Sequence, residues 1–208
     1  HTPLGMLATC TTICEMEKAS DRMPAYSRIN DSFALPIPYR VIDAMGPAGS
    51  INSNAKDMAK WLLAWINTGK YNGQQIIPTN FRTQAMTIQM ASGGEPSNEN
   101  SDVHNFGYGL AWTVGNYRGH YRVEHGGGID GFISTTCFFP SDSLGIFVSS
   151  AAGNISSPIR NWIADKMLSL PFRDWHKQMR DAFVKSRLAA LMSPKSNEDP
   201  NTVKNTKP

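Results

Sequence analysis

Four consecutive residues, His125-Gly126-Gly127-Gly128, are the strongest candidate for a chemical site in this 208-residue chain. Three glycines in a row remove every side chain over that distance, so a ligand can approach the backbone closely. Histidine can donate a hydrogen bond and can be cationic near neutral pH, which suits contact with a carbonyl or a carboxylate. The alternative is a loose loop that carries a solvated histidine.

The residues around this stretch predict paired strands. Phe132–Phe139 is β-branched and aromatic, residues 140–143 form a turn cluster, and Leu144–Ser150 is a second apolar run. Together they predict a hairpin, and the continuous apolar character of 144–148 predicts that its second strand is central and covered on both faces. A further strand pair is expected at Phe106–Val114 and Tyr117–Glu124, with the turn at Gly115-Asn116.

Helices are expected before and after these strands in the chain, and the last of them should cover one face of a sheet at Phe106–Ala151. Ser53 is the predicted N-cap of a helix that ends before Gly69, and a second helix should run from Thr79 to about Met90. A third should span Pro158–Leu170. Its predicted apolar face consists of Ile159, Trp162, Ile163, Met167 and Leu168.

The string HGGGIDGFIS and the strands after it resemble the third active-site motif of the serine β-lactamase and penicillin-binding protein superfamily. That motif is Lys-Thr-Gly, or His-x-Gly in esterase-like and peptidase-like members. The resemblance places His125 at the Lys position, Gly126 at the Thr and Gly127 at the Gly. Gly128 then supplies a backbone N–H to the oxyanion hole, a contact typically worth about 3 to 4 kcal/mol in the transition state.

Three other stretches support the resemblance. Pro3-Leu4-Gly5-Met6 is similar to the segment after the second motif, Tyr-x-Asn, and residues 47–62 are similar to the helix that supports the active-site floor. Residues 106–112, FGYGLAW, are similar to a Y-G-x-G-W-like strand of the family. The implied fold is α/β (α+β): an antiparallel β-sheet flanked by helices, β-lactamase/transpeptidase-like, with an incomplete N-terminal half.

The expected organisation is the C-terminal portion of that domain at 1–171, a trailing amphipathic helix at 172–192 and a linker at 193–208. In many relatives such a linker leads to a β-rich C-terminal domain, a possible further partner. The missing N-terminal half of the same domain is the expected partner upstream. The resemblance also implies a periplasmic or secreted location.

The implied function is a serine hydrolase whose Ser-x-x-Lys nucleophile lies upstream of this chain. Gly126 lacks the hydroxyl that β-lactamases of the family use on the antibiotic's carboxylate, so small-molecule or peptide substrates with ester or amide bonds are favoured over β-lactams. The one literal match, Ser53-Asn54-Ala55-Lys56, is rejected as nucleophile because Ser53 is expected at a helix cap. The isolated chain is therefore expected to be inactive. The alternative is a non-catalytic relative that binds a ligand or peptide.

The composition argues against several other classes of function. The formal net charge is +3, and residues from Arg173 onward hold eight Lys/Arg against four Asp/Glu, so the body is near neutral. Nothing resembles a basic patch interleaved with aromatics, which argues against nucleic-acid binding. Cys10 and Cys14 could pair or bind a metal ion, but no second Cys/His pair at ligand spacing accompanies them, and Cys137 is expected to be buried. Neither a cofactor nor a metal is expected.

Overall fold

The computed structural model describes residues 2–28, 33–92, 98–151 and 153–192. The chain divides into two compact units, His1–Arg173 and Asp174–Pro208. The first unit carries the candidate site. The second carries α6 (Trp175–Met192), and the predicted linker at 193–208 lies outside the described residues.

A six-stranded antiparallel sheet forms the centre of the first unit. In spatial order its strands are β10 (Leu144–Ala151), β9 (Phe132–Phe139), β8 (His120–Ile129), β7 (Thr113–Tyr117), β6 (Val103–Tyr108) and β5 (Met90–Ala91). Each strand pairs with its neighbour in sequence, so the sheet is a meander. The antiparallel sheet and its flanking helices confirm the predicted fold class.

The turns of the meander explain its register. Arg118 and Gly119 join β7 to β8 with both φ angles positive, 53° and 94°, as a tight hairpin turn requires. Asp130 and Gly131 join β8 to β9, and the 3-10 helix η3 (Pro140–Asp142) leads into β10. The predicted β9–β10 hairpin is confirmed.

The predicted turn at Gly115-Asn116 is wrong, because both residues lie inside β7. A side chain at Gly115 would place its Cβ 2.5 Å from the carbonyl oxygen of His104 on β6. This glycine therefore permits close strand packing, and the chain reverses at Arg118-Gly119 instead.

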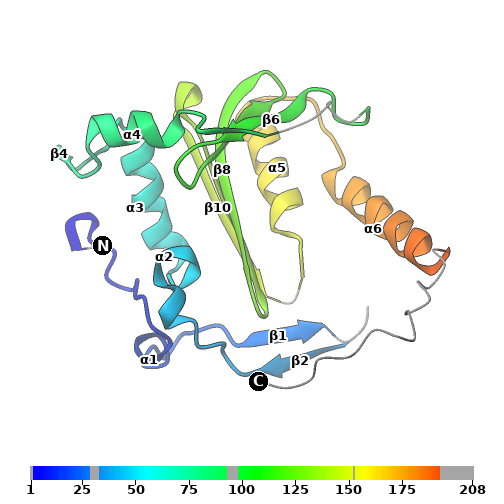
Figure 1. Cartoon of the computed structure of the whole chain (residues 1–208), viewed down its shortest axis with the longest axis horizontal. Coiled ribbons are helices and arrows are strands. Elements are labelled where there is room, and N and C mark those ends of the chain that lie inside the picture. The colour runs from blue at the N-terminus through cyan, green and yellow to red at the C-terminus, as the bar shows by residue number, and fades with distance from the viewer. Residues whose placement is uncertain (1, 29–32, 93–97, 152, 193–208) are drawn as a thin grey trace, which may run out of the picture. The chain divides into compact units, whose positions relative to one another are not determined.

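Two helices cover the opposite faces of the sheet, α3 (Ala55–Ile66) on one and α5 (Ser156–Met167) on the other (Figure 1). The α3 face is the apolar core: the Trp65 ring lies 5.1 Å from that of Trp112 and 5.8 Å from that of Phe138. Asn54 caps α3, with its side-chain oxygen accepting from the N–H of Asp57 at 2.9 Å. The predicted cap, Ser53, bonds Thr9 instead.

The inner face of α5 differs from the prediction. The buried residues of this helix are Ser156, Pro158, Arg160, Ala164 and Asp165. The expected apolar face is substantially exposed, with Ile159 at 38% and Trp162 at 49%. The prediction failed because polar groups on β8 and β9 pair with Arg160, so a charged face is the one that packs on the sheet.

Strand β10 is also placed differently from the prediction. Both α3 and α5 contact it, as its apolar sequence indicates, but it ends the sheet among the described residues. Val148 is half-buried there. The prediction of a central strand is therefore wrong for this chain.

Shorter elements complete the fold. Helix α4 (Thr79–Met86) ends before the predicted Met90, because Thr87 is extended and Met90 pairs in β5. The others are η1 (Thr2–Leu4), α1 (Ile13–Met16), β1 (Ala25–Arg28), β2 (Ala34–Ile37), η2 (Asp43–Met45), α2 (Gly46–Gly49), β3 (Lys70–Tyr71) and β4 (Gln74–Gln75).

Candidate active site

The candidate residues His125 to Gly128 lie in the second half of β8, and all four are exposed. Strand β7 pairs with β8 only as far as Glu124, opposite Thr113. Strand β9 continues alongside β8 to Ile129. The site segment therefore has a strand on one side and, among the described residues, an open edge on the other.

The two hairpins fix which backbone groups face that edge. A two-residue turn closes on a hydrogen-bonded pair, and such pairs then alternate along an antiparallel ladder. The closing pairs are Tyr117–His120 and Ile129–Phe132. Counting from either turn gives the same result: odd-numbered residues of β8 bond toward β9, and even-numbered ones toward β7. Beyond Glu124 there is no β7, so the N–H groups of Gly126 and Gly128 point to the open edge.

The three glycines keep this edge bare. None of them has a positive φ, so the backbone alone does not demand glycine here. A Cβ added at Gly128 would meet nothing within 4 Å, whereas one at Gly127 would lie 3.1 Å from Ser134 Oγ. The conformational freedom of glycine is thus not needed at Gly128, and the space that a Cβ would occupy there is open.

His125 has a partner that the sequence did not identify. The Tyr108 hydroxyl oxygen lies 3.0 Å from His125 Nε2, and the two ring centroids are 6.0 Å apart. Tyr108 ends β6 between two buried glycines that pack against the α4–β5 region: a Cβ at Gly107 would clash with Ile88, and one at Gly109 with the Ala85 carbonyl. The sequence signal that could have identified Tyr108 was the FGYGLAW stretch at residues 106–112, but no site role was predicted for its tyrosine.

A buried charge cluster lies behind the site segment, on the α5 side of the sheet. Glu124 accepts hydrogen bonds from Arg122, at 2.7 Å, and from Arg160. Arg160 also donates to Thr135 Oγ1 at 2.8 Å, and Thr135 pairs with Gly126 across the strands. Burial lowers the pKa of the Arg122 guanidinium, although the Glu124 carboxylate opposes that shift. The cluster joins α5 to the strands that carry the site.

Cys137 lies beside this cluster and is fully buried, as expected from the sequence. Burial raises the pKa of its thiol to about 12, which suppresses the reactive thiolate. Cys10 and Cys14 are also free thiols. Across the described ranges, no group of three or more His, Cys, Asp or Glu could hold a metal ion.

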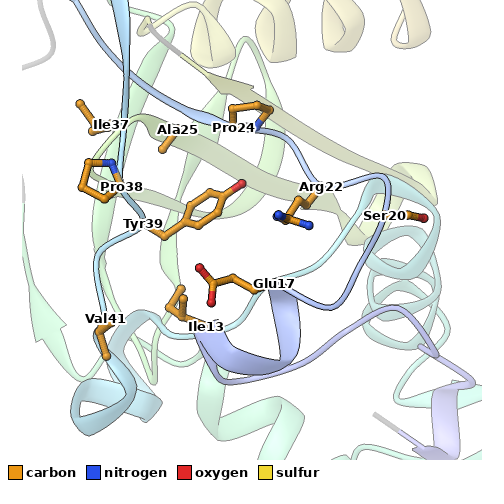
Figure 2. A pocket seen from close by; sticks show the side chains of 10 residues that line it. All are labelled: Ile13, Glu17, Ser20, Arg22, Pro24, Ala25, Ile37, Pro38, Tyr39 and Val41. Atoms are coloured by element: carbon orange, nitrogen blue, oxygen red, sulfur yellow. The ribbon is translucent and has the colours of Figure 1, made fainter.

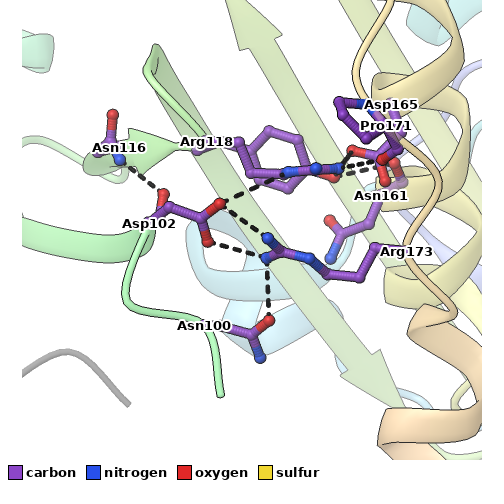
Figure 3. A network of polar contacts seen from close by, with 9 residues as sticks. Asn100, Asp102, Asn116, Arg118, Asn161, Asp165, Pro171 and Arg173 are labelled. Atoms are coloured by element: carbon purple, nitrogen blue, oxygen red, sulfur yellow. Dashed lines mark hydrogen bonds and ion pairs between the residues drawn. The ribbon is translucent and has the colours of Figure 1, made fainter. Parts of the chain in front are cut away.

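A second polar network anchors the β7–β8 turn (Figure 3). Arg173 donates to both carboxylate oxygens of Asp102 at 2.8 Å and holds the pKa of that carboxyl below its usual range. Arg118 forms an ion pair with Asp165 of α5 at 2.9 Å, and Tyr117 donates to the same carboxylate. These contacts hold the start of β8 in place. Because the site segment is the second half of the same strand, they also help to fix its direction.

The Ser53-Lys56 match lies at the start of α3 and takes part in a polar network there, and its rejection as a nucleophile stays a prediction. Ser53 Oγ lies 2.8 Å from Thr9 Oγ1, which donates to Asp57, and Lys56 is exposed. Burial alone would raise the pKa of Asp57, but hydrogen bonds from Lys60, Ala8 and Thr9 hold it below its usual value. This network ties the segment after Pro3-Leu4-Gly5-Met6 to α3.

An open pocket of about 650 Å³ lies among residues 13–41 and contains none of the glycine-triplet residues (Figure 2). Tyr39 and Glu17 line it from different segments. The Tyr39 ring also stacks on Phe132, with centroids 6.3 Å apart, and Arg40 pairs with Asp130 at 3.4 Å. This segment therefore holds the tip of the β8–β9 hairpin.

Comparison with known proteins places these features in a family. The model of the Beta-lactamase family matches residues 2–166. The unguisins hydrolase ungD' of Aspergillus campestris (strain IBT 28561) is 28% identical over 97% of this chain and 39% of its own length. No helix in the described part of the chain is long and apolar enough to cross a membrane.

Two solved structures share the fold. The octameric penicillin-binding protein homologue from Pyrococcus abyssi has a TM-score of 0.67 at 21% identity, covering 81% of this chain and 36% of its own. The D-amino acid amidase from Ochrobactrum anthropi SV3, complexed with L-phenylalanine amide, has a TM-score of 0.53 at 18% identity, covering 86% of this chain and 49% of its own. The chain spans less than half the length of each of these three proteins.

Proposed function

Because this chain belongs to the Beta-lactamase family, we propose that it is the C-terminal portion of a serine hydrolase domain that transfers acyl groups from esters, amides or peptides. One observation carries the proposal: the strand register directs the N–H of Gly128 to an edge that has no neighbouring strand among the described residues, and the exposed His125 lies on the same segment. A fixed backbone donor in such a position suits an oxygen on which negative charge develops.

In the proposed reaction, a serine of an upstream Ser-x-x-Lys motif attacks the substrate's carbonyl carbon and gives its proton to a neighbouring base. The carbonyl π electrons move to oxygen, which accepts a hydrogen bond from the N–H of Gly128. The carbonyl then re-forms as the bond to the leaving group breaks, and the leaving group departs with that electron pair and takes up the proton held by the base. Water, deprotonated by the same base, attacks the acyl-serine, and the serine leaves with its hydroxyl proton restored. His125 contributes a side-chain donor on the same edge, while Gly126 and Gly127 leave room for the substrate backbone.

Ester or amide substrates are favoured over β-lactams. Gly126 supplies no hydroxyl for an antibiotic's carboxylate. The named activities of two similar proteins, an unguisins hydrolase and a D-amino acid amidase, are consistent with this preference.

This chain has two surfaces on which the proposed upstream half could pack. Strand β10 is covered by helices on both faces but lacks a neighbour on its outer edge among the described residues. Ile155, which precedes α5, and Ile159 and Trp162 within it form an exposed apolar stripe at helical spacing. An unpaired strand edge and an apolar helix face are surfaces that a further part of the same domain could cover.

The test is to measure hydrolysis of a small chromogenic ester by this chain alone and by the chain joined to an upstream half that carries Ser-x-x-Lys and Tyr-x-Asn. We expect turnover only from the joined protein, together with labelling of its upstream serine by a fluorophosphonate probe. Labelling of Ser53 in the isolated chain would contradict the proposal. A folded joined protein that binds the ester without turning it over would favour the alternative, a non-catalytic relative that keeps the site.

A further inference from the structure

The hydroxyl of Tyr108 lies 3.0 Å from Nε2 of His125, and no other hydrogen bond or ion pair involves the imidazole among the described residues. A neutral imidazole has one N–H donor and one bare nitrogen acceptor, and the bond made by one nitrogen decides which form the ring adopts. Tyr108 is therefore in a position to set the proton arrangement of the candidate site histidine.

We propose that Tyr108 is a positioning residue: it donates its hydroxyl proton to His125 Nε2 and holds the ring in the neutral form protonated at Nδ1, so that the site selects an uncharged carbonyl over a carboxylate. The substrate class, an ester or amide without a free carboxylate beside the scissile bond, rests on the proposed function. The hydrogen-bond direction does not.

The difference in burial between the two residues favours one direction of the bond. Tyr108 is half-buried and His125 is exposed. If the tyrosine donates, its hydroxyl proton has an acceptor within the protein, and the remaining ring N–H is on the exposed residue, where water or a ligand can accept it. The reverse arrangement would leave the proton of the half-buried hydroxyl without a protein acceptor among the described residues, which is the costlier choice.

The charges around the site segment support the selection of an uncharged group. Arg122 and Arg160, the cations on the opposite side of the strand, are both bonded to Glu124 and buried. Among the described residues, no lysine or arginine is bonded to His125 or Tyr108. A carboxylate at this edge would therefore lose its hydration without gaining a fixed cation from the described residues, whereas a carbonyl oxygen needs only the neutral N–H donors.

The first experiment is nitrogen-15 NMR of the histidine rings in the 208-residue chain at about pH 9, where free histidine is neutral. Ring nitrogens with and without a proton differ widely in chemical shift, and His125→Gln assigns the signals of His125. We expect the wild-type ring to be protonated at Nδ1 and Tyr108→Phe to move it toward the Nε2-protonated form that predominates in water. Tyr121→Phe, an exposed tyrosine on the same strand, is the matched control and should change nothing.

A wild-type His125 that is mainly protonated at Nε2 would overturn the proposal, as would an unchanged ring in folded Tyr108→Phe. If that variant does not fold, the wild-type spectrum alone decides between the two arrangements. A ring protonated at Nδ1 in a joined protein without hydrolase activity would refute the proposed function and leave the role of Tyr108 intact.

The second experiment tests the substrate class in the joined, active protein. Hydrolysis of an amino-acid amide is compared with hydrolysis of the same compound carrying an added free carboxylate next to the scissile bond. We expect higher kcat/KM for the uncharged compound, and Tyr108→Phe should narrow the ratio by about 2- to 10-fold, the range that one hydrogen bond supports. A wild-type preference for the carboxylate, or a ratio that Tyr108→Phe leaves unchanged, would overturn the assigned selectivity.

Discussion

The two halves of strand β8 have opposite environments. From His120 to Glu124 the strand pairs with β7, from Val123 it also pairs with β9, and this half includes the buried residues Arg122 and Val123. From His125 to Gly128 it has β9 alone and is exposed. One continuous strand thus combines a segment that β7 holds with a segment that is exposed at the sheet edge. The change occurs between Glu124 and His125. The rigidity that a catalytic backbone donor needs can come from the first half, while the access it needs comes from the second.

The largest expected effect comes from breaking the buried ion pairs of Glu124 in the first half of β8. Glu124→Leu leaves Arg122 and Arg160 buried without their shared carboxylate, and breaking a buried ion pair in this way costs about 3 to 5 kcal/mol. Urea unfolding of the chain measures this loss. The matched control is Asp130→Asn, which removes an exposed ion pair with Arg40 just after the same strand and should change stability by no more than about 1 kcal/mol. Equal losses of unfolding free energy in Glu124→Leu and Asp130→Asn would contradict the proposed difference between the two halves of β8.

Two glycines test the same contrast through sterics. Gly115→Val forces a side chain against the His104 carbonyl and should prevent stable folding. A Cβ at Gly128 would meet nothing within 4 Å, so Gly128→Val should leave the melting temperature nearly unchanged. In the joined enzyme, Gly128→Val should nevertheless lower kcat by about 10² or more, because the valine blocks approach to the oxyanion donor. Near-normal kcat in folded Gly128→Val would mean that Gly128 is not that donor.

His125→Ala should produce a smaller and different effect. It removes a side-chain donor from the exposed half of β8 but leaves the strand intact, so the fold should survive. We expect KM to rise about 10-fold with a smaller change in kcat. Steady-state kinetics with the chromogenic ester measure both constants. An unchanged KM would place His125 outside substrate recognition.

The smallest effect on the isolated chain is expected on the outer face of α5. Trp162→Gln replaces a side chain that is 49% exposed and should change stability by less than about 0.5 kcal/mol. The same variant should bind a separately expressed upstream half more weakly, which titration calorimetry would measure. Lys166→Gln on the same helix is the control. Strong destabilisation of the isolated chain would show that Trp162 already packs within it.

The sequence predicted the elements whose signals are local. The β9–β10 hairpin was visible because a turn cluster separates two apolar runs, and α3 because its apolar residues recur at helical spacing. The glycine triplet was also a local signal, and the structure places it at a strand edge without a second neighbour among the described residues.

The errors arose where a distant residue decides the outcome. Gly115 looks like a turn glycine until the His104 carbonyl on the neighbouring strand is known to pack against it. The inner face of α5 is polar because Glu124 and Thr135 meet Arg160 there, so apolar periodicity identified the wrong face. The partner of His125 is seventeen residues away on another strand, and only the three-dimensional register brings its hydroxyl to the ring.

Amide hydrogen exchange of the 208-residue chain tests the central claim most directly, because that claim is the direction of the Gly128 N–H. Gly126 and Gly128 should exchange rapidly, at rates close to those of an unprotected amide, while His125 and Gly127 between them should be protected by their bonds to β9. This alternation within four consecutive residues would establish the open edge. If the Gly128 amide is as protected as that of Gly127, its N–H is already bonded within the sheet and cannot stabilise an oxyanion.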